Sequence, residues 1–126
     1  PAFELIEDRA ADYRNLDPLS LIADNAWCGG IVIGSPLKSW RDVDLANQPA
    51  KLSYNGEIEY TNTSAAMGNP LNSLAWLATL LAEQGRSLKA GDIVMSGSTL
   101  ATKFANKGDR ACYEVEGIGA VEVSIE

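Results

Sequence analysis

Four carboxylates lie close together near the start of the chain, and they are the first residues whose types could do chemistry: Glu4, Glu7, Asp8 and Asp12. The mix of apolar and acidic residues predicts a strand over 3–7, which places Glu4 and Asp8 on one face and Glu7 on the other. A carboxylate that projects from such a face suits Mg²⁺ or Mn²⁺, which prefer oxygen ligands. Spacing alone favours a simpler interpretation, an acidic edge strand in water.

A second candidate site is the sequence Ser96-Gly97-Ser98. It follows the apolar run 93–95, which predicts a short buried strand. Backbone amides and hydroxyls at a strand end can hold a substrate carboxylate, although a plain exit from strand to loop explains the same residues equally well. Asp24 and Asn25 are either polar residues near a site or the end of a helix, and on sequence alone the helix end is favoured.

Missing residue types narrow the chemistry further. The chain has no histidine, so it contains no Ser-His-Asp or Cys-His nucleophile and no histidine-ligated zinc site. Cys28 and Cys112 are too few and too far apart for a zinc or CxxC motif, and two small buried thiols are expected. Any chemistry must therefore rest on carboxylates, lysines, hydroxyls, backbone amides or a hard metal ion.

The composition bounds the class of protein. With 126 residues the chain has one domain's length, enough to predict a substantial core. Its net charge of −7, from 17 acidic and 10 basic residues, argues against a nucleic-acid groove and against an anionic membrane surface. Neither an apolar run long enough for a membrane span nor a basic-then-apolar leader is visible, so a cytoplasmic protein is expected.

The helix signals are strongest after Asn69, a predicted N-cap, with Pro70 as the first helical residue. Gly85 is placed to end this helix. A shorter helix is predicted over 18–26, capped by Asp17, with Gly29-Gly30 breaking it. One apolar face of the longer helix recurs at steps of three and four residues, at Leu71, Leu74, Leu77, Ala78 and Leu81.

The remaining pattern predicts short strands and hairpins. A β-branched strand is expected over 31–33, followed by an irregular region anchored by Trp40. Asn55-Gly56 suits a type I′ turn between strands 51–54 and 57–60. A second hairpin, 111–115 with 120–125, turns at 117–119. Many short strands with one substantial helix indicate an α+β fold.

Six segments, taken in order, resemble the C-terminal half of the 2-keto-4-pentenoate hydratase and 4-oxalocrotonate decarboxylase family, within the fumarylacetoacetate hydrolase superfamily. Together they cover essentially the whole chain. The segments are PAFELIEDR at 1–9, IADNAWCGGIVIG at 22–34, MGNPLNSLAWLATLLAEQG at 67–85, LKAGDIVMSGS at 88–98, NKGDRA at 106–111 and EGIGAVEVSI at 116–125.

The resemblance implies a mixed β-roll and a divalent metal, Mg²⁺ or Mn²⁺, held by three carboxylates. The metal would chelate the carboxylate and 2-oxo oxygens of a small dienoate or keto-acid and stabilise enolate-like charge. Glu4 falls at the position of the third metal-binding glutamate. Ser96, Gly97 and Ser98 match the substrate-side strand end, and Asp24 and Asn25 match a polar pair near the site.

The family's other two metal carboxylates and its acid–base lysine are expected upstream of this chain. Glu57-Ile58-Glu59 has the letters of their Glu-x-Glu strand, but it follows the Asn-Gly turn and is expected to face water. Residues 1–126 are therefore interpreted as the C-terminal half of a catalytic domain, inactive alone. Expected partners are a small keto-acid substrate and either further copies of the chain or the missing N-terminal half, with no nucleic acid and no membrane.

The resemblance leaves the reaction open between hydration of 2-hydroxypenta-2,4-dienoate and decarboxylation. Ser64, where relatives often have glycine, and Glu7-Asp8-Arg9, in place of a more usual Asp-Ser-Arg, put the fine specificity in question. Three other interpretations stand behind these: an acylpyruvate carbon–carbon hydrolase of the same superfamily, a non-catalytic assembly subunit, and a tautomerase that uses the Pro1 amine as a general base.

Overall fold

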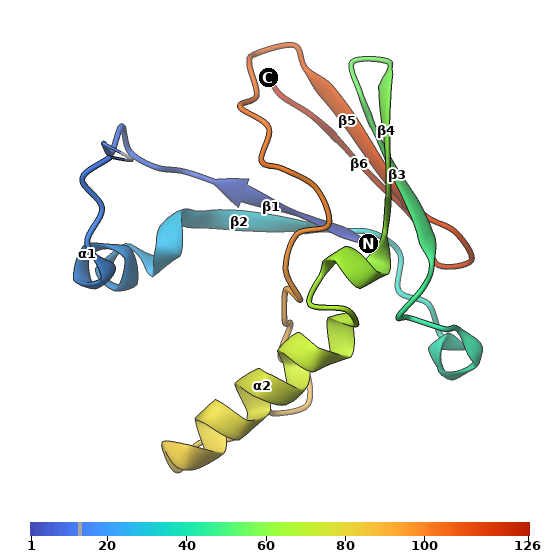
Figure 1. The fold of residues 1–126 in the computed structure, drawn as a ribbon. Helices are drawn as coiled ribbons and strands as arrows, with labels where there is room; N and C mark the ends of the chain where they lie inside the picture. The colour runs from blue at the N-terminus through green and yellow to red at the C-terminus, as the bar shows by residue number, and fades with distance from the viewer. Residues whose placement is uncertain (13) are drawn as a thin grey trace.

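Two antiparallel sheets and two α-helices make up the computed structural model, which describes residues 1–12 and 14–126 (Figure 1). One sheet has two strands and the other has four, in the order β4-β3-β5-β6. This is the α+β class that the sequence predicts. The strands are β1 (Ala2–Ile6), β2 (Cys28–Ile33), β3 (Pro49–Tyr54), β4 (Glu57–Asn62), β5 (Arg110–Val115) and β6 (Gly119–Ser124); the helices are α1 (Pro18–Ala23) and α2 (Pro70–Glu83), with 3₁₀ turns at Asn25–Trp27, Trp40–Asp42 and Thr63–Ala65.

Both predicted hairpins are confirmed in the four-stranded sheet. Asn55 and Gly56 have φ values of 52° and 89°, and a type I′ turn requires positive φ at both positions. Strands β5 and β6 turn at 117–119, with Val115 opposite Gly119. The inner face of this sheet carries Leu52 and Val121, both buried.

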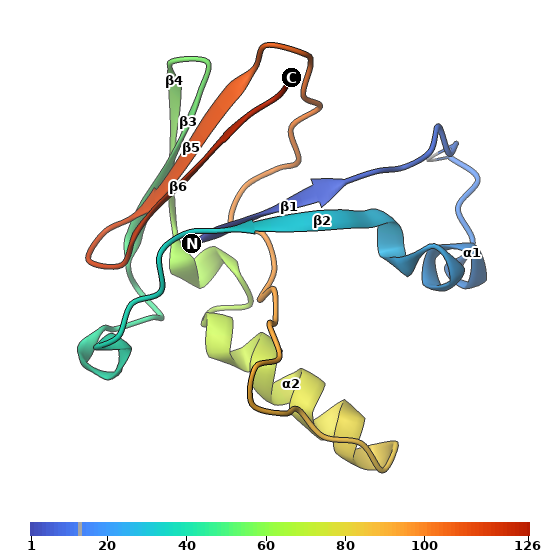
Figure 2. The same cartoon turned by 180° about the vertical axis from the view of Figure 1, so that it is seen from behind.

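The two sheets meet where the chain enters β1 and leaves β2 (Figure 2). The backbone nitrogen of Gly34 donates a hydrogen bond of 3.0 Å to the Pro1 carbonyl. A Cβ atom at Gly34 would lie 2.6 Å from the Ala120 carbonyl oxygen of β6. Glycine therefore allows the end of β2 to pass directly against the edge strand of the larger sheet.

Gly34→Ala is expected to destabilise the fold by about 1–3 kcal/mol, because the methyl group forces β2 and β6 apart. Gly30→Ala is the matched control: its Cβ would meet only the Leu5 side chain, at 4.0 Å. Urea unfolding of both variants measures the difference. Equal midpoints for the two variants would contradict this account of the junction.

A cluster of hydrogen bonds joins the turn between β3 and β4 to the residues that lead into β5. The Asp109 carboxylate accepts hydrogen bonds from the Tyr54 hydroxyl (2.5 Å), the Asn106 backbone nitrogen (2.8 Å) and the Asn55 side-chain amide (2.9 Å). These bonds, the one from Tyr54 foremost, lower the pKa of Asp109 from 3.8 to about 2.

Because the folded state lowers this pKa, ionised Asp109 stabilises the fold above pH 3.8, and the contribution is lost as the pH falls toward about 2. Asp109→Asn should therefore unfold at lower urea concentration than the parent at pH 7. The gap between the two midpoints should shrink between pH 4 and pH 2. A gap independent of pH would show that the carboxylate's charge plays no part.

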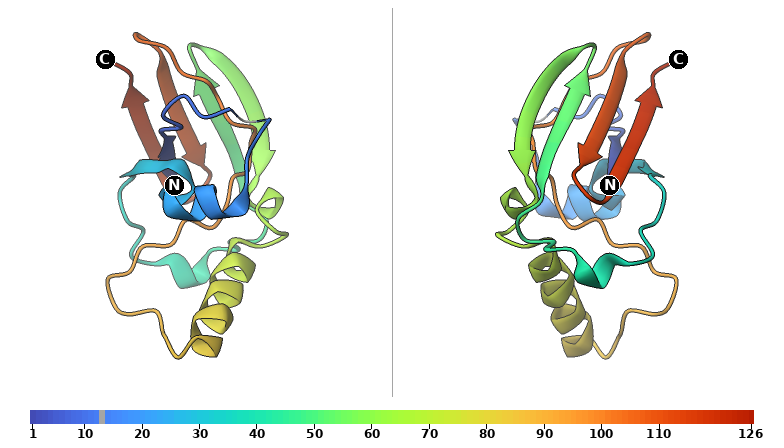
Figure 3. Two further views of the ribbon diagram at one scale, coloured as in Figure 1. Left: turned by 90° about the vertical axis from the view of Figure 1, so that its left-hand side faces the viewer. Right: turned by 90° about the vertical axis from the view of Figure 1, so that its right-hand side faces the viewer.

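The long helix α2 forms where it was predicted. The Asn69 side chain accepts a hydrogen bond from the Leu71 backbone nitrogen at 2.9 Å, and Gly85 follows the helix with φ +69°. The helix points away from both sheets (Figure 3), and none of its residues is buried. Leu71 and Leu74 are exposed and Trp76 is 61% exposed. Neither described helix is long and apolar enough to cross a membrane.

The predicted buried strand at 93–95 is wrong in this structure. No described residue pairs with it, and Ile93 is 62% exposed. A strand needs a neighbour for its backbone groups, and here the segment runs as an extended loop between α2 and β5 (Figure 1). The prediction of a substantial core is also wrong: the buried hydrophobic residues are Ala50, Leu52, Ala66, Val115 and Val121.

Four further local predictions need correction. Helix α1 ends at Ala23 rather than at residue 26, because the three residues 25–27 have positive φ. Gly29 and Gly30 were predicted to end this helix, but they lie inside β2. Trp40 does not anchor the irregular region: it is 43% exposed and packs under the Arg41 guanidinium, 4.7 Å from the ring centroid. Cys28 and Cys112 are free and half-buried rather than buried.

Candidate functional site

Glu4 stands alone among the four N-terminal carboxylates. It lies in β1 opposite Ile31 of β2 and is exposed, and its side chain has no hydrogen bond or ion pair to any residue that the structure describes. Strand β1 ends at Ile6, so Asp8 does not share a strand face with Glu4 as predicted. The side chains of Glu7, Asp8 and Asp12 instead accept backbone hydrogen bonds in the turns that follow β1. Glu4 is therefore the carboxylate of this group that is available to a ligand.

The Ser-Gly-Ser sequence lies in the extended segment that connects α2 to β5. The Ser73 hydroxyl of α2 donates to the Ser96 carbonyl at 2.6 Å. Gly97 has φ +106°, a conformation that favours glycine. The Ser98 hydroxyl is 2.5 Å from the Leu100 carbonyl and 3.3 Å from its backbone nitrogen. Residues 96–98 are thus fixed by local hydrogen bonds rather than by a strand.

The four-stranded sheet holds the continuation of this loop. The Thr61 hydroxyl of β4 donates to the Thr99 carbonyl at 2.7 Å, and the Thr99 hydroxyl lies 2.8 Å from the Tyr113 hydroxyl of β5. Lys103 forms an ion pair with Glu59 of β4. Sequence reasoning missed these anchors, because hydroxyl residues in hairpin strands carry no signal of a contact with a loop far away in the chain.

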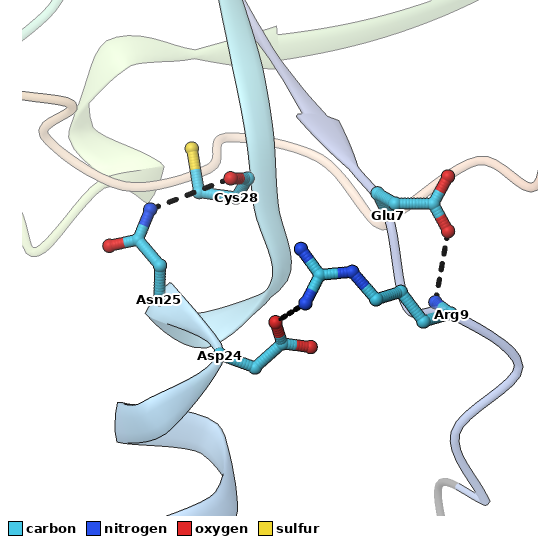
Figure 4. A network of polar contacts seen from close by, with 5 residues as sticks. All are labelled: Glu7, Arg9, Asp24, Asn25 and Cys28. Carbon is cyan, nitrogen blue, oxygen red and sulfur yellow. Dashed lines mark hydrogen bonds and ion pairs between the residues drawn. The ribbon is translucent and has the colours of Figure 1, made fainter.

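Asp24 and Asn25 lie at the other end of the two-stranded sheet, beyond Ile6 (Figure 4). Asp24 forms an ion pair with Arg9, and the Asn25 amide donates to the Cys28 carbonyl at 3.5 Å. Asn25, Ala26 and Trp27 all have positive φ (51°, 49° and 63°), a conformation that asparagine tolerates but that costs energy for Ala26 and Trp27.

The backbone nitrogen of Glu7 donates to the Trp27 carbonyl at 2.9 Å, which together with the Arg9–Asp24 pair ties the end of β1 to the approach to β2. Among the described residues, no hydrogen bond or ion pair joins this network to Glu4 or to the Ser96–Ser98 loop. Asp24 also lines a shallow surface cleft with Asp12, Ser20 and Trp27. The predicted site residues therefore lie in three separate places: Glu4 in β1, Asp24 and Asn25 just before β2, and Ser96–Ser98 between α2 and β5.

The described residues do not complete a metal centre. They contain no group of three or more His, Cys, Asp or Glu side chains placed to hold an ion. Glu57-Ile58-Glu59 does not substitute: it lies on edge strand β4, with Ile58 exposed and Glu59 paired with Lys103. Among the described residues, Glu4 thus remains the one candidate for the three metal carboxylates that the resemblance implies.

Comparison with known families matches residues 6–126 to the C-terminal domain of fumarylacetoacetate hydrolase. The chain belongs to this family, which confirms the resemblance read from its six segments. The fold agrees: the structure of a 4-oxalocrotonate decarboxylase from Pseudomonas putida G7, complexed with magnesium and adipate, aligns with all of this chain at a TM-score of 0.89 and 33% identity. A second structure of that enzyme, complexed with calcium and acetate, gives 0.86 and 34%.

The curated relatives of this chain include both a decarboxylase and a hydratase. A 4-oxalocrotonate decarboxylase of Pseudomonas putida is 34% identical over 96% of this chain and 46% of its own length. A 2-keto-4-pentenoate hydratase of Paraburkholderia xenovorans is 35% identical over 100% of this chain and 47% of its own length. The chain spans about half the length of the curated relatives it matches.

Proposed function

We propose that residues 1–126 are the C-terminal half of a catalytic domain in a metal-dependent lyase that hydrates or decarboxylates small dienoate and keto-acids of aromatic catabolism. The observation that carries this proposal is the match of the whole chain to both kinds of enzyme. Identity of 34–35% extends over 96–100% of the chain. Hydratase and decarboxylase match equally well, so the proposal covers both branches.

Glu4 is the residue of this chain that would hold the metal, Mg²⁺ or Mn²⁺. Its carboxylate is exposed and has no competing partner among the described side chains, and a hard cation prefers such oxygen ligands. Magnesium and calcium in the two solved structures of the decarboxylase support a divalent ion. When bound, the ion would act as a Lewis acid on the substrate's oxygens. Its remaining ligands, and the acid–base lysine, would come from outside this chain.

The Ser96-Gly97-Ser98 loop would bind the substrate carboxylate. The left-handed conformation at Gly97 leaves no side chain in the way of an approaching anion. The bonds from Ser73 and within the loop hold its backbone in one arrangement, which reduces the entropy lost on binding. Asp24 and Asn25 would be polar residues at the margin of the site, held there by Arg9 and by the backbone bond between Glu7 and Trp27.

The complementary half of the domain is the partner that best fits the open surfaces. The apolar side of α2, including Leu71 and Leu74, is exposed, and Ile93 lies in an extended segment without a strand neighbour. A partner that supplied a strand to 92–98 and covered α2 would satisfy both. Such a partner would also be expected to bring the missing carboxylates.

A chimera tests the function. The amino-terminal part of the Pseudomonas putida 4-oxalocrotonate decarboxylase, up to the point where the match begins, is joined to residues 1–126 of this chain. We expect this chimera to release carbon dioxide from 4-oxalocrotonate or to hydrate 2-hydroxypenta-2,4-dienoate, in either case only with Mg²⁺ or Mn²⁺. A chimera that folds and binds the ion but converts neither compound would contradict the proposal.

A further inference from the structure

We propose that Tyr113 is a positioning residue that couples the two walls of the proposed site, strand β1 with Glu4 and the loop with Ser96–Ser98. The inference rests on the proposed function, which makes Glu4 and Ser96–Ser98 parts of one site. The coupling itself rests on contacts of this chain. Tyr113 touches neither Glu4 nor the serines directly, and it acts through Phe3 on one side and Thr99 on the other.

The two ends of the Tyr113 side chain face different segments. Its hydroxyl lies 2.8 Å from the Thr99 hydroxyl, one residue after the Ser-Gly-Ser sequence. Its ring lies 6.4 Å, centroid to centroid, from the ring of Phe3, tilted by 60°. This geometry is typical of favourable aromatic pairs. Phe3 directly precedes Glu4, so one side chain contacts the neighbours of both candidate site elements.

Tyr113 lies on a strand that is paired on both sides. Strand β5 is an inner strand, paired with β3 on one side and β6 on the other, and Tyr113 stands opposite Leu52 and Val121 in the two ladders. Both of these neighbours are buried. The four-stranded sheet therefore fixes the ring and the hydroxyl, whereas β1 belongs to a two-stranded sheet and residues 92–100 pair with no other described strand.

Thr99 is held at two of its atoms, the carbonyl oxygen and the side-chain hydroxyl. Its carbonyl accepts from Thr61 of β4 while its own hydroxyl meets Tyr113 of β5. Two strands of one sheet thus clamp a single loop residue from two directions. Loss of the Tyr113 hydroxyl would free the Thr99 side chain and leave the loop held by Thr61 and by the more distant Lys103–Glu59 pair.

The two arms can be separated by substitution. Tyr113→Phe removes the hydroxyl and keeps the ring, so it should loosen the loop and leave β1 in place. Tyr113→Leu removes both contacts. Thr99→Val removes the partner hydroxyl from the other side. Tyr60→Phe is the matched control, because Tyr60 lies on β4 and is 79% exposed.

The first measurement is a double-mutant cycle by urea unfolding of the 126-residue chain. Tyr113→Phe and Thr99→Val should each lower the equilibrium constant for folding about fivefold, the effect of one neutral hydrogen bond, and together no more than the larger single effect. Tyr60→Phe should change nothing. Additive losses, or a Tyr113→Phe effect equal to that of Tyr60→Phe, would overturn the coupling. This measurement needs no catalysis, so it decides the contact between Tyr113 and Thr99 even if the proposed function fails.

The second measurement uses the chimera, and it also covers variants that unfold the isolated chain. Tyr113→Phe should raise KM for the acid substrate about fivefold, with kcat and the half-saturating Mg²⁺ concentration within twofold of the parent. Tyr113→Leu should raise both KM and the half-saturating Mg²⁺ concentration. A residue that is merely structural would instead lower kcat through the fraction of folded enzyme and leave KM and the Mg²⁺ dependence unchanged, and that result would overturn the positioning role.

Discussion

Glu4→Gln in the chimera is expected to lower kcat/KM by about a thousandfold. A metal ion that acts as a Lewis acid contributes several kcal/mol to transition-state stabilisation, and each 1.36 kcal/mol is a factor of ten in rate. Glutamine keeps the size of the side chain and its place opposite Ile31 but removes the charge that would hold the ion. Steady-state turnover across a range of Mg²⁺ concentrations measures the effect.

The control for Glu4 is Glu57→Gln, an exposed carboxylate at the start of the edge strand β4. It removes the same charge from the chain at a position far from β1 and should leave turnover within twofold of the parent. Equal losses in the two variants would mean that net charge, and not a ligand, is responsible. Unchanged turnover in Glu4→Gln would remove Glu4 from the metal site.

Trp76→Glu is expected to have a small effect on stability in the isolated chain and a large one in the chimera. In the isolated chain Trp76 is 61% exposed, so replacing it should change the free energy of unfolding by less than about 0.5 kcal/mol. In the chimera the same change should cost about 3 kcal/mol, because a covered tryptophan is lost and a charge is buried without a partner.

Thermal or urea unfolding of the four proteins, parent and variant in each context, makes this comparison internally controlled. Glutamate is a good helix former, so helix propensity contributes little to either difference. The same small effect in both contexts would show that α2 stays in water, and that the complementary half docks elsewhere.

The sequence predicted correctly the elements that depend on interactions between residues close together in the chain. Asn55-Gly56 dictates its turn through two positive φ angles, and Asn69 with Pro70 dictates where α2 begins, so both were found at the right residues. The six ordered segments identified the family and, through it, the fold. These successes depend on interactions within a few residues or on a pattern spread over the whole chain.

The failures share a different cause, which is dependence on distant or absent neighbours. The apolar run 93–95 has the composition of a strand, but strand formation requires a backbone partner that the described residues do not provide. The end of α1 could not be read because Ala26 and Trp27, after Asn25, take left-handed conformations that alanine and tryptophan do not favour. The contact between Thr99 and Tyr113 joins positions whose proximity only the folded sheet creates.

The candidate site was predictable to a similar degree. The sequence pointed to Glu4 and to Ser96–Ser98. In the structure the Glu4 side chain has no hydrogen bond or ion pair to another described residue, and Gly97 between the two serines has a positive φ. It did not point to Arg9, which pairs with Asp24, or to Tyr113. Both act through contacts between segments far apart in sequence, for which one sequence read by itself carries no signal.

The most direct test of the central claim compares turnover by the isolated 126-residue chain and by the chimera under identical conditions, with and without Mg²⁺. The chain alone carries one candidate metal carboxylate, and a single carboxylate binds Mg²⁺ weakly in water. The account predicts no conversion of 2-hydroxypenta-2,4-dienoate or 4-oxalocrotonate by the chain, and Mg²⁺-dependent conversion of at least one of them by the chimera. Conversion at an enzymatic rate by the isolated chain would contradict it.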